Sequence, residues 1–206
     1  MLKKEYEIFA QFVKFPWQRF TFKEIKKLSG KKSEGYVYDA LKRFVVSGSL
    51  KEEKAGNVVL YSLNVESLRT QSYAGFIAEY MAWNEEQIPY RDLEKIASKI
   101  PTDFYIFIIT GSYAKNCQKK GSDIDIVIIV DDNTAPKRVY SELKYACEMN
   151  IPPIHLYVFK RSEMLAMLLD KKANYGTEIA RNNLILSGGE NYFRIMSEAM
   201  KNGFNG

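Results

Sequence analysis

The chain has 206 residues, of which 46% are hydrophobic and 27% charged, a balance typical of folded globular proteins rather than disordered ones. Its two cysteines are too few for a disulfide framework and have no partner cysteines or histidines at zinc-binding spacing. No stretch approaches the roughly 20 apolar residues of a membrane span, and no signal peptide is visible at the start. These features predict a cytoplasmic protein with no membrane contact.

The net charge of +5 is unevenly distributed along the chain. Residues 1–63 contain 13 Lys and Arg against 7 Asp and Glu, whereas the remaining 143 residues contain 17 against 18. This basic excess favours a polyanionic partner for the first third of the chain. A solvated, lysine-rich surface explains the same charge equally well.

The first third also has the spacing of three short helices. Apolar residues at helical intervals predict a helix from Leu2 to about Lys14. Thr21-x-x-Glu24 is a capping box that predicts the start of a second helix. Ser33 is the predicted N-cap of a third helix, which carries an apolar stripe along one side.

A hairpin and a helical segment follow these helices. Residues 50–63 alternate around a turn at Lys54-Ala55-Gly56-Asn57, which predicts a β-hairpin. Three helices and then a hairpin is the order of a winged helix-turn-helix domain, which we assign to residues 1–64. Residues 65–100 predict a helical connector with a break near Ile88-Pro89.

From residue 101 onward, strands and helices alternate. Strongly apolar runs predict buried strands over 104–109, 124–130 and 154–159. Helical stretches are predicted between and after them, over 135–149, 161–172 and 189–201. The pattern predicts an α/β (α+β) domain over residues 101–206.

Two carboxylates stand at the start of the second of these strands. Asp123 and Asp125 are two residues apart, so both side chains leave the same face of the strand. They repel each other unless a cation lies between them, and such oxygen ligands suit Mg²⁺ bound together with substrate phosphates. Upstream, Gly111 lets a phosphate approach the backbone, and Ser112 offers a hydroxyl and an amide at the start of a helical turn. Acidic residues at strand ends are common, so the prediction depends on the combination.

The combination resembles a known signature. Gly111-Ser112, ten further residues and then Asp123-Ile124-Asp125 resemble the DNA polymerase β-like nucleotidyltransferase superfamily, and in particular its minimal nucleotidyltransferase group. The resemblance covers about residues 95–200. It implies a small mixed sheet and the transfer of a nucleoside monophosphate, AMP from ATP or another NTP, with Mg²⁺ or Mn²⁺ as cofactor. It also implies that Asp123 and Asp125 are catalytic metal ligands and that the nucleotide is bound by Gly111, Ser112, Lys115 and Ser122.

The chain departs from the family pattern at two places. The family commonly has Ala-Arg-Gly after Gly-Ser, whereas this chain has Ala114-Lys115-Asn116, which keeps the charge but not the guanidinium fork. The family's third carboxylate lies on a later strand, where this chain has His155 by alternation. His155 is either a catalytic base or weak metal ligand, or a strand histidine in a site that binds nucleotide with little or no turnover. A transferase and a catalytically degenerate nucleotide sensor therefore both remain open.

The resemblance also implies a partner. Relatives in the minimal group often act in toxin–antitoxin pairs with a helical toxin of the HEPN type, and some of them adenylylate that toxin. The acceptor can be a protein, a nucleic acid or a small molecule, and such a toxin is one candidate. The alternative is an antitoxin or transcriptional regulator that binds DNA and whose nucleotidyltransferase domain no longer catalyses transfer.

In the predicted winged helix-turn-helix domain, the third helix is the recognition helix. We expect it to bind double-stranded DNA through basic and hydroxyl groups on the helix, before it and on the hairpin. Glu34 and Asp39 on the same face weaken this prediction, and winged helices also serve as protein-binding or dimerisation modules, so a homodimer is the alternative. The residues expected to contact DNA are Lys31, Lys32, Ser33, Tyr38, Lys42, Arg43 and Lys54.

Overall fold

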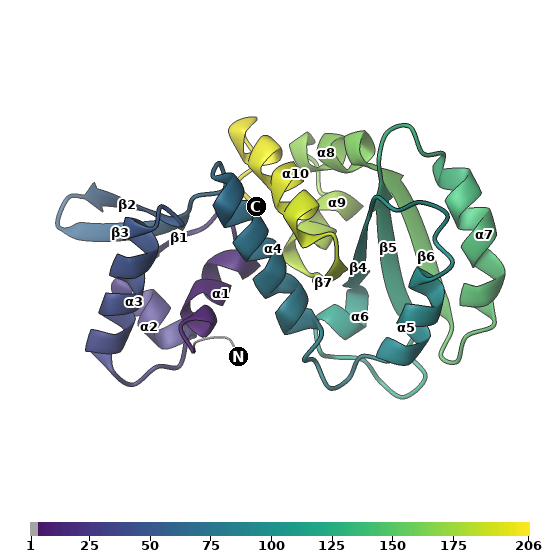
Figure 1. The fold of residues 1–206 in the computed structure, drawn as a ribbon, viewed down its shortest axis with the longest axis horizontal. Helices are drawn as coiled ribbons and strands as arrows, with labels where there is room; N and C mark the ends of the chain where they lie inside the picture. The colour runs from purple at the N-terminus through teal and green to yellow at the C-terminus, as the bar shows by residue number, and fades with distance from the viewer. Residues whose placement is uncertain (1–3) are drawn as a thin grey trace.

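The computed structural model describes residues 4–206 as ten helices and seven strands arranged in two sheets (Figure 1). A small sheet and three helices lie on one side of the molecule, a larger sheet lies on the other, and two long helices pass between them (Figure 1). Leu2, where the predicted first helix starts, lies outside the described residues. Within residues 4–206, no helix combines the length and apolarity needed to cross a membrane.

The N-terminal part has the predicted order of three helices and a hairpin. Its elements are α1 (Tyr6–Lys14), β1 (Arg19–Thr21), α2 (Phe22–Leu28), α3 (Glu34–Val46), β2 (Leu50–Ala55) and β3 (Val58–Leu63). The strands form an antiparallel sheet in the order β1-β3-β2. Sequence reasoning missed β1, whose three residues are too few for a recognisable alternation.

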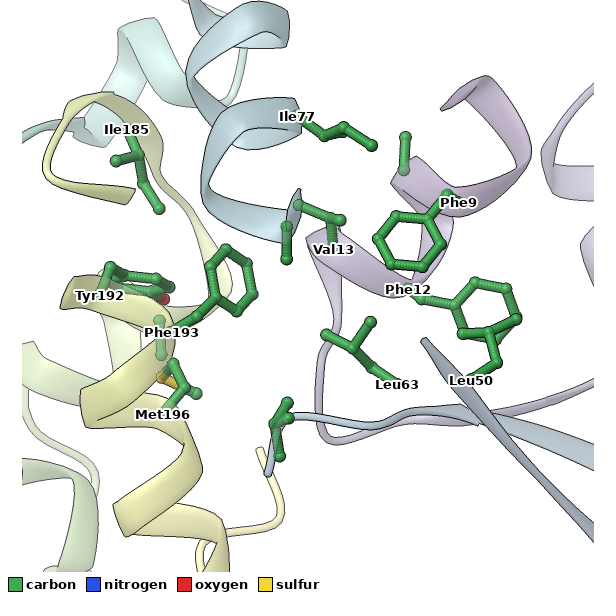
Figure 2. Close-up of a cluster of buried hydrophobic side chains, with 14 of the residues drawn as sticks. Phe9, Phe12, Val13, Leu50, Leu63, Ile77, Ile185, Tyr192, Phe193 and Met196 are labelled. Carbon is green, nitrogen blue, oxygen red and sulfur yellow. The ribbon is translucent and has the colours of Figure 1, made fainter. Parts of the chain in front are cut away.

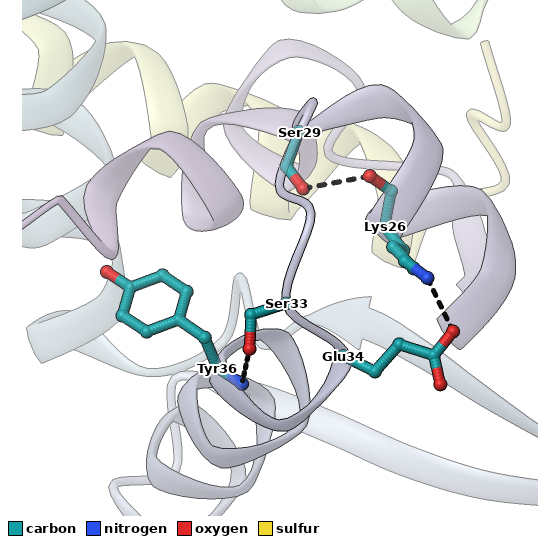
Figure 3. A network of polar contacts seen from close by, with 5 residues as sticks. All are labelled: Lys26, Ser29, Ser33, Glu34 and Tyr36. Carbon is teal, nitrogen blue, oxygen red and sulfur yellow. Dashed lines mark hydrogen bonds and ion pairs between the residues drawn. The ribbon is translucent and has the colours of Figure 1, made fainter.

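The predicted caps hold two of these helices in place. The Thr21 hydroxyl accepts from the amide of Glu24 at 3.3 Å, and the Glu24 carboxylate accepts from the amide of Thr21 at 2.7 Å. The Thr21 amide and, at 2.8 Å, the Thr21 hydroxyl both donate to the Glu24 carboxylate, and these two hydrogen bonds lower the pKa of Glu24. Figure 3 shows the start of α3, where Ser33 accepts from the amide of Tyr36 at 3.3 Å and Glu34 pairs with Lys26 of α2.

The rest of the chain forms the larger unit. Its elements are α4 (Leu68–Ala82), α5 (Tyr90–Ala97), β4 (Tyr105–Thr110), α6 (Gly111–Ala114), β5 (Ile124–Val130), α7 (Pro136–Glu148), β6 (Ile154–Lys160), α8 (Arg161–Leu169), α9 (Tyr175–Arg181), β7 (Leu184–Ser187) and α10 (Gly189–Lys201). The strand order is β6-β5-β4-β7, with β5 and β6 parallel and the other pairs antiparallel. The mixed α/β fold is confirmed. The helix predicted over 161–172 is α8, which ends earlier, at Leu169, and the sequence did not predict α9 or β7.

Both faces of the larger sheet are buried. Ile108 and Val127 lie on the face that joins the main core, and Phe107 and Ile126 lie on the opposite face, against α5 and α7. A strand buried on both faces cannot alternate apolar with polar residues. The continuous apolar runs of β4 and β5 follow from this position.

Helix α4 belongs to the core rather than to a free connector. Ile77 of α4 is fully buried in one cluster with Phe9 of α1 and Phe193 of α10 (Figure 2). Trp83, at the C-terminal end of α4, donates from its indole nitrogen to the carbonyl of Leu186 in β7 at 2.9 Å. The helix therefore joins the N-terminal part to the larger sheet.

Helices α4 and α10 touch through two glycines. A Cβ on Gly75 would lie 2.3 Å from the amide nitrogen of Glu190, and a Cβ on Gly189 would lie 2.6 Å from the carbonyl oxygen of Gly75. Beside this contact, the Glu79 carboxylate accepts from the amide of Gly189 at 2.7 Å, and the Ser72 hydroxyl donates to Glu190 at 2.6 Å. The crossing tolerates no side chain at either glycine.

We expect Gly75→Ala to lower the free energy of unfolding by about 2–4 kcal/mol, because the new methyl group meets backbone atoms that cannot rotate away. Urea denaturation of both variants measures this. The matched control is Gly35→Ala in α3, where nothing lies within 4 Å of the new Cβ. That control should stabilise by about 0.5–1 kcal/mol. Equal effects of the two variants would contradict the proposed crossing.

Candidate functional site

Three strands bring the predicted site residues to one edge of the larger sheet. Asp125 of β5 is in register with Thr110, the last residue of β4, and with His155, the second residue of β6. Asp123 lies one residue before β5. Because adjacent strands are about 4.8 Å apart, the register alone places the two carboxylates and the imidazole close together.

The imidazole lies between the two carboxylates. Nε2 of His155 is 3.3 Å from Oδ2 of Asp123, and Nδ1 is 3.4 Å from Oδ1 of Asp125. A neutral imidazole carries one N–H, so it can donate to only one of these oxygens, whereas the imidazolium can donate to both. The exposed fractions of the side chains are 56% for His155, 41% for Asp123 and 27% for Asp125. Solvent and ligands therefore reach all three.

Gly111 is required by the carboxylate beside it. Its φ is +67°, in the left-handed region, and a Cβ there would lie 2.1 Å from Oδ2 of Asp125. The sequence suggested that this glycine makes room for a phosphate, but in the structure the Asp125 carboxylate occupies the space. Gly111 and Ser112 then form the first turn of α6, where the backbone N–H groups have no acceptor within the helix.

The other two predicted nucleotide-binding residues are engaged elsewhere. Nζ of Lys115 pairs with Oε1 of Glu178 in α9 at 2.6 Å, and this hydrogen bond raises the pKa of Lys115. The Ser122 hydroxyl accepts from the amide of Lys119 at 2.8 Å and so closes the turn before Asp123. The structure brings together Gly111, Ser112, Asp123, Asp125 and His155, whereas it directs Lys115 toward α9.

Sequence reasoning missed an aromatic wall beside the carboxylates. The ring centroids of Tyr157 in β6 and Tyr175 in α9 are 4.8 Å apart. The pKa of Tyr175 is raised, first by burial and then by Tyr157 and Asp125. Alternation from His155 already places Tyr157 on the same face, but nothing in the sequence indicated α9.

The donor set fits one hard cation. Asp123 and Asp125 offer two carboxylates at a partly open edge, and Mg²⁺ binds through one or two carboxylates together with waters and substrate phosphates. Among the described residues, no group of three or more His, Cys, Asp and Glu side chains is arranged to hold a metal ion. A cation here would complete its coordination with ligands from outside the protein.

The residues predicted to contact DNA lie on and around α3. Nζ of Lys42 is 4.9 Å from the ring centroid of Tyr38, and both side chains are exposed. Lys31 pairs with Glu7, and Arg43 pairs with Glu5 at 2.7 Å, so both cations are held at the start of α1.

The other three predicted contacts sit before α3 and on the hairpin. The Ser33 oxygen serves as the cap of α3. Lys32 before the helix and Lys54 in β2 are exposed. Exposed cations thus flank the N-terminal end of α3 and the hairpin.

Comparison with known proteins shows what the segment around this site is similar to. Residues 92–172 match the family model described as a nucleotidyltransferase domain, a range that runs from within α5 to just after α8. No curated protein matches the chain. A solved structure described as a toxin–antitoxin with AMP-PNP is similar at 17% identity and a TM-score of 0.40, over 55% of this chain and 87% of that one. Residues 92–172 are therefore similar to nucleotidyltransferase domains, and the structural similarity is too weak to support a conclusion of its own.

We expect Gly111→Ala to destabilise the protein more than Gly121→Ala. Both glycines have a left-handed φ, +67° and +86°, so both variants bear about 1–2 kcal/mol of backbone strain. Only Gly111→Ala also displaces the Asp125 carboxylate, since nothing lies within 4 Å of a Cβ on Gly121. An additional loss of about 1–3 kcal/mol in chemical denaturation is therefore expected. Equal losses would show that the carboxylate is not held against Gly111.

Proposed function

We propose that this protein transfers a nucleoside monophosphate, AMP from ATP, to an acceptor hydroxyl in a reaction that depends on a divalent cation. The observation that carries this proposal is the pair Asp123 and Asp125 at the edge of the sheet, directly beside the Gly111-Ser112 turn. The nucleotidyltransferase match over residues 92–172 supports it.

In this proposal each site residue has a role. Asp123 and Asp125 would hold Mg²⁺ or Mn²⁺, which would supply positive charge for the triphosphate and the leaving pyrophosphate. Gly111 and Ser112 bind phosphate oxygens through the free amides at the start of α6. Lys115 adds a positive charge to the phosphates when it leaves Glu178, and Ser122 holds the turn that positions Asp123.

The transfer step needs a base for the acceptor. The acceptor oxygen forms a bond to the α-phosphorus, the bond from that phosphorus to the bridging oxygen breaks, and pyrophosphate leaves with the electron pair. His155 takes the proton of the acceptor hydroxyl. The carboxylates at 3.3 and 3.4 Å stabilise the imidazolium that forms.

The acceptor that we propose is a partner toxin protein of the HEPN type. The support is the resemblance of the Gly-Ser-Tyr-Ala and Gly-Ser-Asp-Ile-Asp-Ile segments to the minimal nucleotidyltransferase group. The site is compatible with a protein acceptor because it opens at the edge of the sheet, where the His155 side chain is 56% exposed.

A second candidate function follows from the missing third carboxylate. His155 lies 3.3 and 3.4 Å from the two aspartates, and its imidazolium form would offset one of their two negative charges without a metal. A domain in this state could bind nucleotide without turnover, as part of a DNA-binding regulator or antitoxin.

For the N-terminal part, residues 1–64, we propose a winged helix-turn-helix domain that binds double-stranded DNA, with residues 65–100 linking it to the catalytic domain over 101–206. The order of α1, α2, α3 and the β2–β3 hairpin supports this assignment. In it, α3 enters the major groove with Tyr38 and Lys42 exposed, and the hairpin that carries Lys54 lies along the backbone.

We expect labelled ATP and Mg²⁺ to transfer label to the partner toxin with the unchanged protein, and Asp123→Asn to reduce the rate about 100-fold or more, because one cation ligand is lost. The matched control is Asp103→Asn, an exposed aspartate before β4, which should keep full activity. ATP binding without transfer to any acceptor tested would overturn the transferase and favour the nucleotide sensor.

We expect Lys42→Ala to weaken binding to the DNA upstream of the protein's own gene. The slope of the logarithm of the binding constant against the logarithm of the salt concentration should fall by about one unit for each phosphate contact that is lost. Electrophoretic mobility shifts across a salt series measure both quantities. Lys95→Ala on α5 removes the same charge outside the N-terminal part and should change neither. If the two variants behave alike, α3 is not the DNA-contacting helix.

A further inference from the structure

A hollow of about 380 Å³ lies where the N-terminal part meets the nucleotidyltransferase domain. Its walls come from the end of α1, from α4, from the end of α6 and from the connection between α9 and β7. Of the residues assigned to the candidate active site, Lys115 lines it, whereas Gly111, Ser112, Ser122, Asp123, Asp125 and His155 do not. The hollow is therefore a separate feature, at the far end of α6 from the Gly111 turn.

Three cations from three different elements line this hollow. Lys14 ends α1, Lys115 follows α6 and Arg181 ends α9. Within residues 4–206, neither Lys14 nor Arg181 forms an ion pair, and Lys115 pairs with Glu178. The one acidic residue in the lining is Glu85. A basic residue at a helix C-terminus is favourable by itself, but that preference does not explain why three helix ends converge on one hollow.

The remaining lining suits a flat ring. The apolar part comes from α1, α4, α6 and β7 and consists of Val13, Ala78, Met81, Ala114, Leu184 and Ile185. Two side-chain amides in the lining are available to hydrogen-bond a ligand. The side chain of Asn116 makes no hydrogen bond to any described residue. The side-chain nitrogen of Asn182 donates to Glu178 at 3.2 Å, which leaves the Asn182 side-chain oxygen free. The hollow thus offers an apolar surface, polar groups that can read a ring edge, and positive charge.

We propose that this hollow is a second nucleotide site, which binds a nucleoside diphosphate or triphosphate as an effector. The base packs on the apolar wall, Asn116 and Asn182 bond to its edge, and Lys14 and Arg181 contact the phosphates. A volume of about 380 Å³ lies within the usual range of ligand sites. The binding needs no carboxylate-bound cation and does not depend on nucleotidyl transfer.

An effector in this position connects the two parts of the molecule. Val13 and Lys14 belong to α1, whereas Arg181 and Ile185 belong to the nucleotidyltransferase side. A nucleotide that contacts both sides stabilises their packing by mass action. The nucleotide concentration then determines how firmly the N-terminal part is held against the nucleotidyltransferase side.

The test measures binding of ADP in EDTA to the double variant Asp123→Asn/Asp125→Asn, in which the metal-dependent site is disabled. We expect one ADP per chain by isothermal titration calorimetry, and a rise in Tm with ADP. Adding Arg181→Ala or Lys14→Ala to this double variant should lower the affinity for ADP about tenfold, because each removes a charge-assisted contact to phosphate. Circular dichroism checks that each variant is folded, and Arg181→Gln replaces Arg181→Ala if that variant is not.

Two controls locate the bound ADP. Lys172→Ala removes an exposed cation between α8 and α9 that does not line the hollow, and it should leave ADP affinity unchanged. Ser112→Ala alters the candidate active site and should also leave it unchanged. The proposal is overturned if no ADP binds in EDTA, if Ser112→Ala weakens it, or if Lys172→Ala matches Arg181→Ala. Transfer of label from ATP is measured separately, so either proposal can fail alone.

Discussion

The close contact between α4 and α10 is the constraint on which the rest of the molecule depends. Gly75 and Gly189 let the two backbones touch, and Glu79 caps the first turn of α10 at the same place. Because α4 also packs against α1 and β7, this contact fixes how the N-terminal part sits on the larger sheet. One buried cluster then runs through both (Figure 2).

At the edge of the sheet, charge and shape also restrict which residues can be accommodated. The Asp125 carboxylate fills the space where Gly111 lacks a Cβ, and the imidazole of His155 lies against both aspartates. Carboxylates this close need positive charge nearby, whether from a cation or from an imidazolium. With His155 beside them, the negative charge of Asp123 and Asp125 can be offset by a metal ion or by a protonated imidazole.

Features with strong local signals could be predicted from the sequence. The capping box at Thr21 and the apolar runs of β4 and β5 follow from short-range patterns, whereas the place of His155 in the site was predicted from the family resemblance. The short elements β1, α9 and β7 could not be predicted, since each is stabilised by packing against residues far along the chain. Tyr175 and the Glu178 partner of Lys115 were missed for this reason, because both lie on α9.

The crossing of α4 and α10 also bears on how the chain acquires its structure during synthesis. Ser72 and Glu190, which are hydrogen-bonded in the finished protein, are separated by 118 positions. Until α10 leaves the ribosome, the side of α4 around Gly75 has no C-terminal partner, and the part of the core that Phe193 and Met196 fill is open. Contacts between such distant segments form slowly, and exposed apolar surface favours aggregation or capture by a chaperone. Completion of the core therefore waits for α10.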